Sequence, residues 1–156
     1  MRWVARENLH ITLWFIGEAA DPEREAICAA LANPNWSIPV FSLSLAGCGA
    51  FPPSGQPRVL WIGVREGMRE MQDVYADLAT RLAPLGYEPE RRPYAPHLTI
   101  GRVKEAGGGA SRVVRPILGA CPARCGSSPV RAITLFRSRL CPKGAAYDAV
   151  LRVPLS

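Results

Sequence analysis

The sequence contains only two histidines, His10 and His97, and each is followed two positions later by a threonine. Only four threonines occur in the 156 residues, so chance placement after both histidines has a probability of roughly one in a thousand. An unperturbed imidazole titrates near neutral pH, so one ring can act as a base while the other acts as an acid. Such a pair suits displacement at phosphorus, in which the nucleophile loses a proton and the leaving oxygen gains one.

The residues around the histidines supply groups that could hold a phosphate. The hydroxyls of Thr12 and Thr99 can donate hydrogen bonds to its non-bridging oxygens. Five positions after each histidine the two copies differ: Arg102 offers a planar fork of donors, whereas Phe15 is either a stacking face for a base or a core side chain. Residues five apart on a strand point to opposite faces. To share the face of His97, Arg102 must therefore lie beyond the strand end or after a bulge, and Gly101 permits either.

Both motifs are predicted to lie on strands, where residues two apart point to the same face. Residues 9–17 are rich in β-branched and aromatic side chains and end at a glycine, and residues 97–103 follow the same pattern. The two motifs are 87 positions apart, and the same offset aligns the expected strand 58–64 with 145–151. This repeat predicts two pseudo-symmetric lobes, each carrying one motif, that face each other at a shared site.

The repeat offset also indicates a missing element, because the counterpart of the helix predicted at 67–84 would precede Met1. We therefore expect one bilobal domain over residues 1–156, whose first lobe lacks an N-terminal strand and helix. Hydrophobic periodicity and the positions of glycine and proline predict the remaining elements. The helices are expected over 22–32, 67–84 and 111–119, and the strands over 40–47, 130–139 and 146–153. Turns are expected at 52–55 and 142–144, and a loop at 107–109.

Charge is distributed unevenly along the chain. The net charge is +6, but residues 1–86 sum to −2 and residues 87–156 to +8. Such asymmetry predicts a nucleic acid or another phosphate-rich ligand, against the alternative of a solvated basic face without a partner.

Cysteine and histidine content argues against a metal centre. Cys121 and Cys125 are the only close pair among five scattered cysteines, and no further ligands lie nearby for zinc. The odd, scattered set does not indicate a disulfide framework, so we expect reduced thiols. The N-terminus lacks a signal-peptide core, and no apolar run approaches the ~18 residues needed to span a bilayer. We therefore expect a cytoplasmic protein with no metal, no cofactor and no membrane contact.

These motifs resemble those of the 2H phosphoesterase superfamily, and in particular its bacterial and archaeal 2′-5′ RNA ligase branch, also called RNA 2′,3′-cyclic phosphodiesterase. The resemblance covers nearly the whole chain. It is carried by the segments around the two motifs, 8–18 and 96–103, and by the tail segment 140–147.

The resemblance implies an α+β fold with two antiparallel sheets lining a central cleft and helices outside. It implies metal-independent opening of a terminal ribose 2′,3′-cyclic phosphate to the 2′-phosphate, and in some members reversible, ATP-independent 2′-5′ joining of RNA ends. His10 would protonate the 3′-oxygen leaving group and His97 would activate water. Thr12, Thr99 and Arg102 would hold the phosphate.

Two other functions remain open from the sequence. The first is a phosphodiesterase for another cyclic phosphate, such as ADP-ribose 1″,2″-cyclic phosphate or a small cyclic nucleotide. The second is a non-catalytic module that binds RNA ends with salt-dependent affinity. In each case the expected partners are RNA ends or cyclic nucleotides. We expect a monomer, with a dimer through the uncovered N-terminal edge as the alternative.

Overall fold

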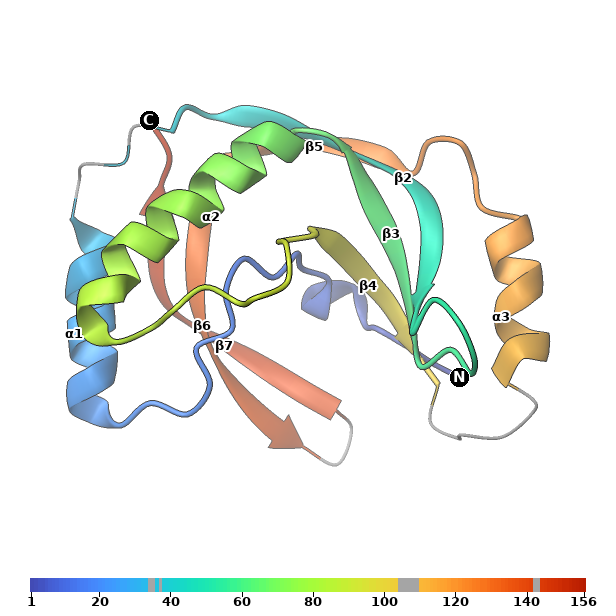
Figure 1. The fold of residues 1–156 in the computed structure, drawn as a ribbon, viewed down its shortest axis with the longest axis horizontal. Coiled ribbons are helices and arrows are strands. Elements are labelled where there is room, and N and C mark those ends of the chain that lie inside the picture. Colours follow the sequence, from blue (N-terminus) through green and yellow to red (C-terminus); the bar gives the residue numbers. More distant parts are fainter. Residues whose placement is uncertain (34–35, 37, 104–109, 142–143) are drawn as a thin grey trace. The chain divides into compact units, whose positions relative to one another are not determined.

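The structure is a computed structural model that describes residues 1–33, 36, 38–103, 110–141 and 144–156 (Figure 1). The chain forms two compact units. The first comprises residues 1–12, 43–68 and 96–128, and the second comprises residues 13–42, 69–95 and 129–156. The α+β class expected from the resemblance is confirmed, whereas the pseudo-two-fold relation and the cleft stay predictions.

A five-stranded sheet supplies the framework of the first unit. Its strands run in the order β1-β4-β3-β2-β5, and the β1–β4, β4–β3 and β3–β2 pairs are antiparallel. Leu60 of β3 is fully buried. The strands are β1 (Arg2–Trp3), β2 (Phe41–Phe51), β3 (Val59–Glu66), β4 (His97–Arg102) and β5 (Gly126–Val130).

The predicted strand over residues 9–17 does not form. The 3-10 helix η1 (Arg6–Asn8) follows β1, and Ile11 then makes one isolated antiparallel bridge to Leu98. Val4 donates its backbone N–H to Ile100 O at 2.9 Å, so the N-terminal segment runs along the edge of β4. The turn of η1 takes up the residues between Val4 and Ile11. Only one residue pair of the expected strand therefore remains.

Helices follow the sequence patterns more closely than the strands do. Helix α1 (Asp21–Ala32) begins where Glu23 accepts a hydrogen bond from Ala20 N at 2.7 Å. Helix α2 (Met68–Leu82) buries one stripe of apolar side chains and passes into the 3-10 helix η2 (Ala83–Leu85), which ends at Gly86 in a left-handed conformation. The predicted helix at 111–119 is α3 (Ala110–Gly119).

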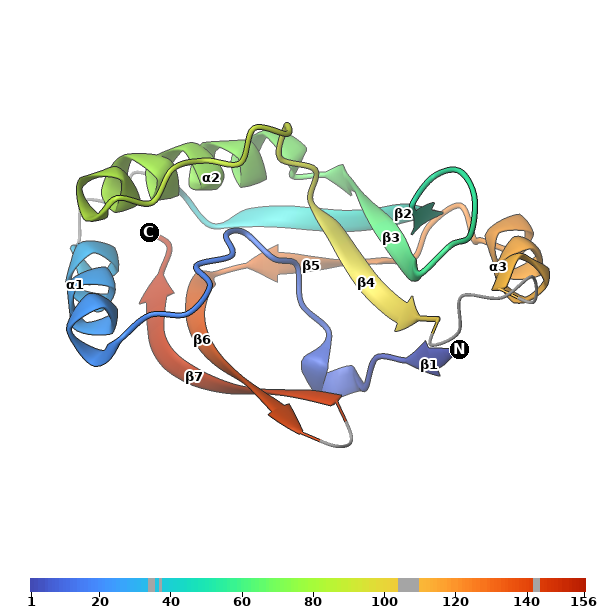
Figure 2. The same cartoon turned by 60° about the horizontal axis from the view of Figure 1, so that its bottom comes forward.

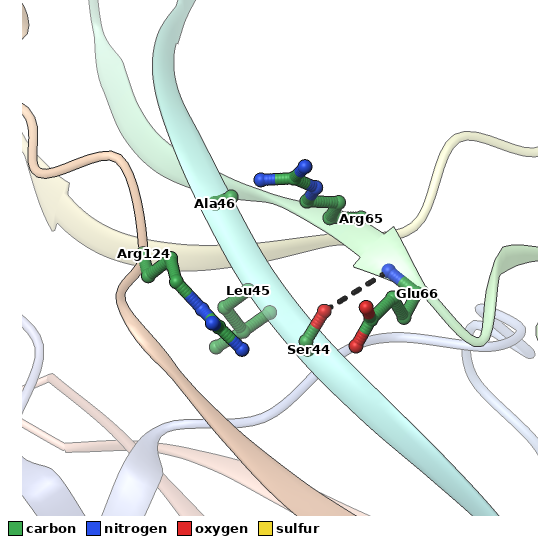
Figure 3. Close-up of a pocket in the computed structure, with 6 residues that line it drawn as sticks. All are labelled: Ser44, Leu45, Ala46, Arg65, Glu66 and Arg124. Atoms are coloured by element: carbon green, nitrogen blue, oxygen red, sulfur yellow. Dashed lines mark hydrogen bonds between the residues drawn. The ribbon is translucent and has the colours of Figure 1, made fainter.

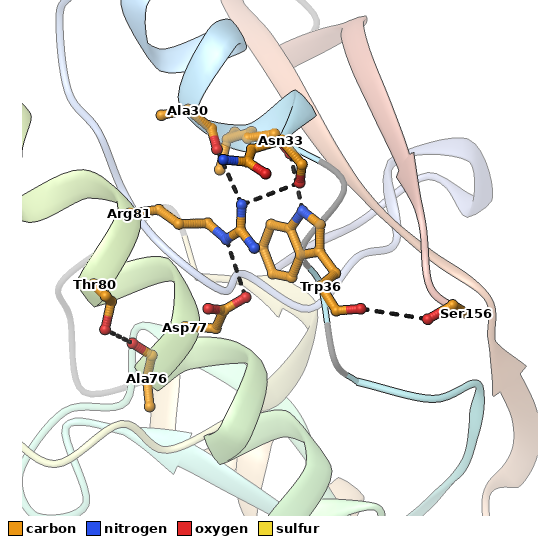
Figure 4. Close-up of polar contacts among 9 residues, drawn as sticks. Ala30, Asn33, Trp36, Ala76, Asp77, Thr80, Arg81 and Ser156 are labelled. Carbon is orange, nitrogen blue, oxygen red and sulfur yellow. Dashed lines mark hydrogen bonds and ion pairs between the residues drawn. The ribbon is translucent and has the colours of Figure 1, made fainter.

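Arg81 joins α1 and α2 in the second unit (Figure 4). Its Nη1 donates to the carbonyl oxygens of Ala30 and Asn33, both at 3.2 Å, and its Nε pairs with Asp77 at 3.0 Å. The guanidinium also lies 4.1 Å from the ring centroid of Trp36. The positive charge thus satisfies carbonyl groups at the C-terminal end of α1, where cations are favoured.

Three stacked rings hold the segments that flank the two motifs. The ring of Tyr75 in α2 lies 5.0 Å from that of Trp14 and 4.5 Å from that of Tyr94, centroid to centroid. Trp14 follows Thr12 by two positions, and Tyr94 precedes His97 by three. Burial, and to a lesser degree the neighbouring Tyr75, raises the pKa of the Tyr94 hydroxyl well above its ordinary value.

A long hairpin completes the second unit. Strands β6 (Ala132–Cys141) and β7 (Gly144–Pro154) form a two-stranded antiparallel sheet and lie side by side over their whole length (Figure 2). The predicted strand 130–139 is therefore displaced by two residues, and the separate strand β5 before it was not predicted. Arg139 donates two hydrogen bonds to Asp148, and this hydrogen bonding lowers the pKa of that carboxyl.

The expectation of reduced thiols throughout is wrong for one pair of cysteines. Cys48 of β2 and Cys121 after α3 form a disulfide, while the neighbouring Cys125 keeps its thiol. The 73-residue separation explains why spacing alone concealed the pair. Cys125 instead donates its backbone N–H to Leu45 O at 2.8 Å, which docks the same loop on β2.

Some predictions fall outside the described residues, namely the loop at 107–109 and most of the turn at 142–144. Within the described part of the chain, no helix combines the length and apolarity needed to cross a membrane.

Candidate phosphate-binding site

The two His–x–Thr motifs meet through the bridge between Ile11 and Leu98. In this antiparallel register His10 stands opposite Thr99, and Thr12 stands opposite His97. Directly opposed residues place their side chains on the same face of a sheet. By this register the four motif positions share one face, within a single unit. The sequence predicted one motif in each of two facing lobes, and that arrangement stays a prediction.

A bulge brings Arg102 to the same face. Residues at alternate positions of β3 share a face, and their partners on β4 share it with them. The register between the strands shifts at Ile100, which has no partner on β3. Because of this extra residue, the β4 residues after Ile100 point to the opposite face from the one that strict alternation would give them. The strand pairing therefore supplies the bulge that lets Arg102, five residues after His97, share the face of that histidine. Three pairs define what we call the motif face: His97 with Gly63, Thr99 with Trp61, and Arg102 with Val59.

Arg2 is a functional candidate that sequence analysis missed. It lies directly opposite Arg102 in the β1–β4 pairing and so belongs to the motif face. Both arginines are exposed, so two guanidinium groups can meet an anion at this end of the face. Arg2 is eight residues from the nearer histidine, and no spacing rule relates the two. Only the register of a two-residue strand reveals it.

A hydrogen bond sets the tautomer of His10. The Nδ1 atom lies 2.8 Å from the carbonyl oxygen of Asn8, which can only accept a hydrogen bond. Nδ1 therefore carries a proton, and Nε2 is the atom that can exchange one with a substrate. The His10 side chain is exposed, so Nε2 is accessible to a ligand.

His97 lies among aromatic rings. Its ring centroid is 5.1 Å from that of Phe51 in an edge-to-face arrangement and 6.1 Å from that of Trp61. Phe51 and Trp61 do not stand out in the sequence, because aromatic residues on strands are ordinary core residues. Their pairing with the motif strand is visible only in the structure.

Phe15 is placed differently from the other predicted site residues. It belongs to the second unit, and 80% of its surface is exposed. Of the two alternatives weighed from the sequence, a core side chain is therefore wrong. A stacking face for a base stays a prediction.

A small polar pocket lies elsewhere in the first unit (Figure 3). It encloses about 110 Å³, and no motif residue lines it. The pocket forms where Arg65 bulges from β3, and Ser44 Oγ accepts a hydrogen bond from Glu66 N at 3.2 Å. Arg65 and Arg124 give it positive charge, with Glu66 as a counter-charge. In the described residues, no three His, Cys, Asp or Glu side chains gather as a metal site would require.

The chain is similar to a known protein family in sequence and to solved structures in fold. The protein-family model described as the 2′-5′ RNA ligase superfamily matches residues 2–125. The RNA 2′,3′-cyclic phosphodiesterase of Aeropyrum pernix is 34% identical over 153 residues, which cover 98% of this chain and 85% of that protein. The solved structure of TT0787 from Thermus thermophilus has a TM-score of 0.79 at 27% identity, covering 99% of this chain and 81% of that one. The structure of Escherichia coli LigT complexed with 3′-AMP has a TM-score of 0.75 at 28% identity, with the same two coverages.

Proposed function

The chain belongs to the 2′-5′ RNA ligase superfamily, and we propose that it is an RNA 2′,3′-cyclic phosphodiesterase. The observation that supports the proposal is the register of Ile11 opposite Leu98, because it puts the positions of two histidines and two threonines on one face. The name of the Aeropyrum pernix relative supports the substrate, a ribose 2′,3′-cyclic phosphate at an RNA end.

The reaction requires one proton donor and one proton acceptor on opposite sides of the phosphorus. His97 takes a proton from water as its oxygen attacks phosphorus. The bond between phosphorus and O3′ breaks, and His10 gives a proton to that oxygen from Nε2. The products are a 2′-phosphate and a free 3′-hydroxyl, so protons and bonds balance.

The phosphate is held by the groups that share the face with the histidines. Thr12 and Thr99 donate hydroxyl hydrogen bonds to the non-bridging oxygens, and Arg102 donates from its guanidinium. Charge that accumulates on these oxygens during attack is stabilised by donors already in position. The second arginine, Arg2, adds positive charge beside Arg102.

Hydrolysis of adenosine 2′,3′-cyclic phosphate in the presence of EDTA tests the proposal. We expect adenosine 2′-phosphate as the product, formed at the same rate with and without the chelator. A requirement for added metal, or formation of the 3′-phosphate, would contradict the mechanism. Binding of RNA without any product would instead identify a non-catalytic RNA-end module.

The family also supports a second candidate activity, the ATP-independent joining of RNA ends. A 5′-hydroxyl that replaces water as the nucleophile would form a 2′-5′ linkage by the same two proton transfers. An RNA with a cyclic phosphate end, mixed with a second RNA bearing a 5′-hydroxyl, should yield a joined product. If hydrolysis proceeds but no joined RNA forms at high concentrations of the second strand, the protein is a hydrolase only.

A further inference from the structure

Phe51 is an exposed aromatic ring beside a proposed catalytic histidine. It ends β2, and 37% of its surface is exposed, although its ring lies 5.1 Å from that of His97. An apolar ring exposed next to a polar site leaves surface that a ligand could cover.

The strand register places this ring and the arginines in one row across the sheet. Arg2 lies opposite Arg102, Arg102 opposite Val59, and Val59 opposite Phe51. Opposed residues share a face, so Phe51 belongs to the motif face. Strands β4 and β2 are separated by β3, and two strand spacings amount to about 10 Å. The face therefore presents cationic groups at one end and an aromatic ring at the other, at a separation that one nucleotide can span.

Trp61 supports the Phe51 ring from one side. The two ring centroids are 5.2 Å apart, with the planes inclined by 33°. The indole of Trp61 lies across Gly49 of the neighbouring strand, where a Cβ atom would collide with the ring carbons. Gly49 thus makes room for Trp61 beside Phe51. A braced, exposed ring loses little freedom when a ligand stacks on it.

A nucleobase has the chemistry to occupy this position. It is flat, it stacks on aromatic rings with little dependence on sequence, and it is joined to a phosphate through one ribose. We propose that Phe51, braced by Trp61, is the platform on which the base of the terminal nucleotide stacks. The inference rests on the proposed function for the identity of the ligand, and it assigns a base-binding role to a residue outside the His–x–Thr motifs.

A pair of substrates with and without a base tests the platform. The first is adenosine 2′,3′-cyclic phosphate, and the second is methyl ribofuranoside 2,3-cyclic phosphate, which has the same reacting group. For Phe51→Leu we expect kcat/KM on the nucleotide to fall by roughly 10-fold, mainly through KM, because base stacking is lost. Activity on the base-free substrate should fall far less, so that the ratio of the two activities drops by roughly 10-fold. Phe51→Trp should retain the preference for the nucleotide.

A matched control comes from the other sheet. Phe136 is also exposed, at 46%, and its ring meets Tyr147 edge to face, yet it lies in the β6–β7 hairpin of the second unit. Phe136→Leu should leave the ratio of the two activities as in the unaltered protein. Equal losses on both substrates in Phe51→Leu would overturn the proposal, because they would mean that Phe51 acts only on His97. No change on either substrate would overturn it as well.

Binding without turnover separates this inference from the proposed function. Calorimetry with adenosine 2′-phosphate and ribose 2-phosphate measures the contribution of the base directly. If the protein hydrolyses nothing but Phe51→Leu weakens only the nucleotide, the platform stands and the proposed activity fails. If the protein hydrolyses the cyclic nucleotide and Phe51→Leu binds both ligands as before, the activity stands and the platform fails.

Discussion

Ile11 lies opposite Leu98 in a single antiparallel bridge, and this pair fixes how the two His–x–Thr motifs face each other. The bridge carries no side chain that could do chemistry. Its role is to set a register in which each histidine stands opposite the threonine of the other motif. A shift of one residue would turn one motif away from the other, because side chains alternate between the two faces of a sheet.

The two histidines should act as one catalytic unit. His10→Ala and His97→Ala should each lower kcat by at least about 100-fold, the usual contribution of a general acid or base. The double variant should lose far less than the product of the two single losses, because acid and base act in one step. The unaltered protein should show a bell-shaped dependence of rate on pH. Near-normal turnover in either single variant would contradict the assignment of the two histidines. Thr80→Ser on α2, outside the proposed site, serves as the control and should keep normal turnover.

The two arginines at the end of the motif face should differ in importance. Arg102→Met should raise KM for a cyclic mononucleotide by about 10-fold, because a charge-assisted hydrogen bond to the phosphate is lost. Arg2→Met should have a smaller effect on the mononucleotide and a larger one on an RNA with several phosphates. Arg112→Met, at an exposed position of α3, controls for the general loss of positive charge. Equal KM values for Arg102→Met and Arg112→Met would remove Arg102 from the site.

Loss of the disulfide should destabilise the protein without altering its chemistry. Cys48→Ala frees a loop closed over 73 residues, and chain entropy then predicts a loss of about 4 kcal/mol in the free energy of unfolding. Denaturant titration with and without reducing agent measures the loss. A reductant should destabilise the unaltered protein and leave Cys48→Ala unchanged. Cys28→Ala, which removes a free thiol, should not abolish the response to reductant.

Arg81 should matter far more than an exposed ion pair of similar composition. Its side chain is 10% exposed and contacts two carbonyls, Asp77 and the ring of Trp36, so Arg81→Met should cost about 2 kcal/mol of unfolding free energy. Arg24 pairs with Asp21 at the surface, where such pairs contribute about 0.5 kcal/mol or less. Arg24→Met is therefore the matched control. Similar losses in the two variants would show that the carbonyl contacts of Arg81 contribute little.

Tyr94 should make stability depend on pH in the alkaline range. Burial raises the pKa of its hydroxyl in the folded state, so folding favours the protonated phenol. Its contribution is complete below the pKa of an unfolded tyrosine, about 10, and is lost as the pH rises above that value. Unfolding free energies measured on both sides of pH 10 should fall more steeply for the unaltered protein than for Tyr94→Phe. Parallel slopes would contradict this origin.

The sequence predicted the helices well because their signals are local. The apolar stripe of α2 and the glycine after it lie within one window of the chain, and tertiary packing needs only to use them. The strand at residues 9–17 failed for the opposite reason. Its β-branched and aromatic residues have a high strand propensity, but a strand also needs a partner along its length. After the turn of η1, only Ile11 of this segment pairs with β4, through Leu98.

Site residues divide in the same way. His10, Thr12, His97 and Thr99 could be proposed from the sequence because a repeat within one chain marks them, and strand parity alone requires a bulge or a strand end before Arg102. Arg2, Phe51 and Trp61 could not be proposed from the sequence, because only the order β1-β4-β3-β2 places them on the motif face. The disulfide was hidden by the same kind of long-range pairing.

The two compact units are interleaved along the polypeptide. Each is assembled from three separate stretches, so neither corresponds to a continuous fragment that a truncated gene could encode. Contacts between distant stretches form only after long loops have closed, which favours a late and concerted assembly over stepwise growth from one end. Recombination that exchanges a contiguous segment across any boundary between these stretches would therefore alter both units at once.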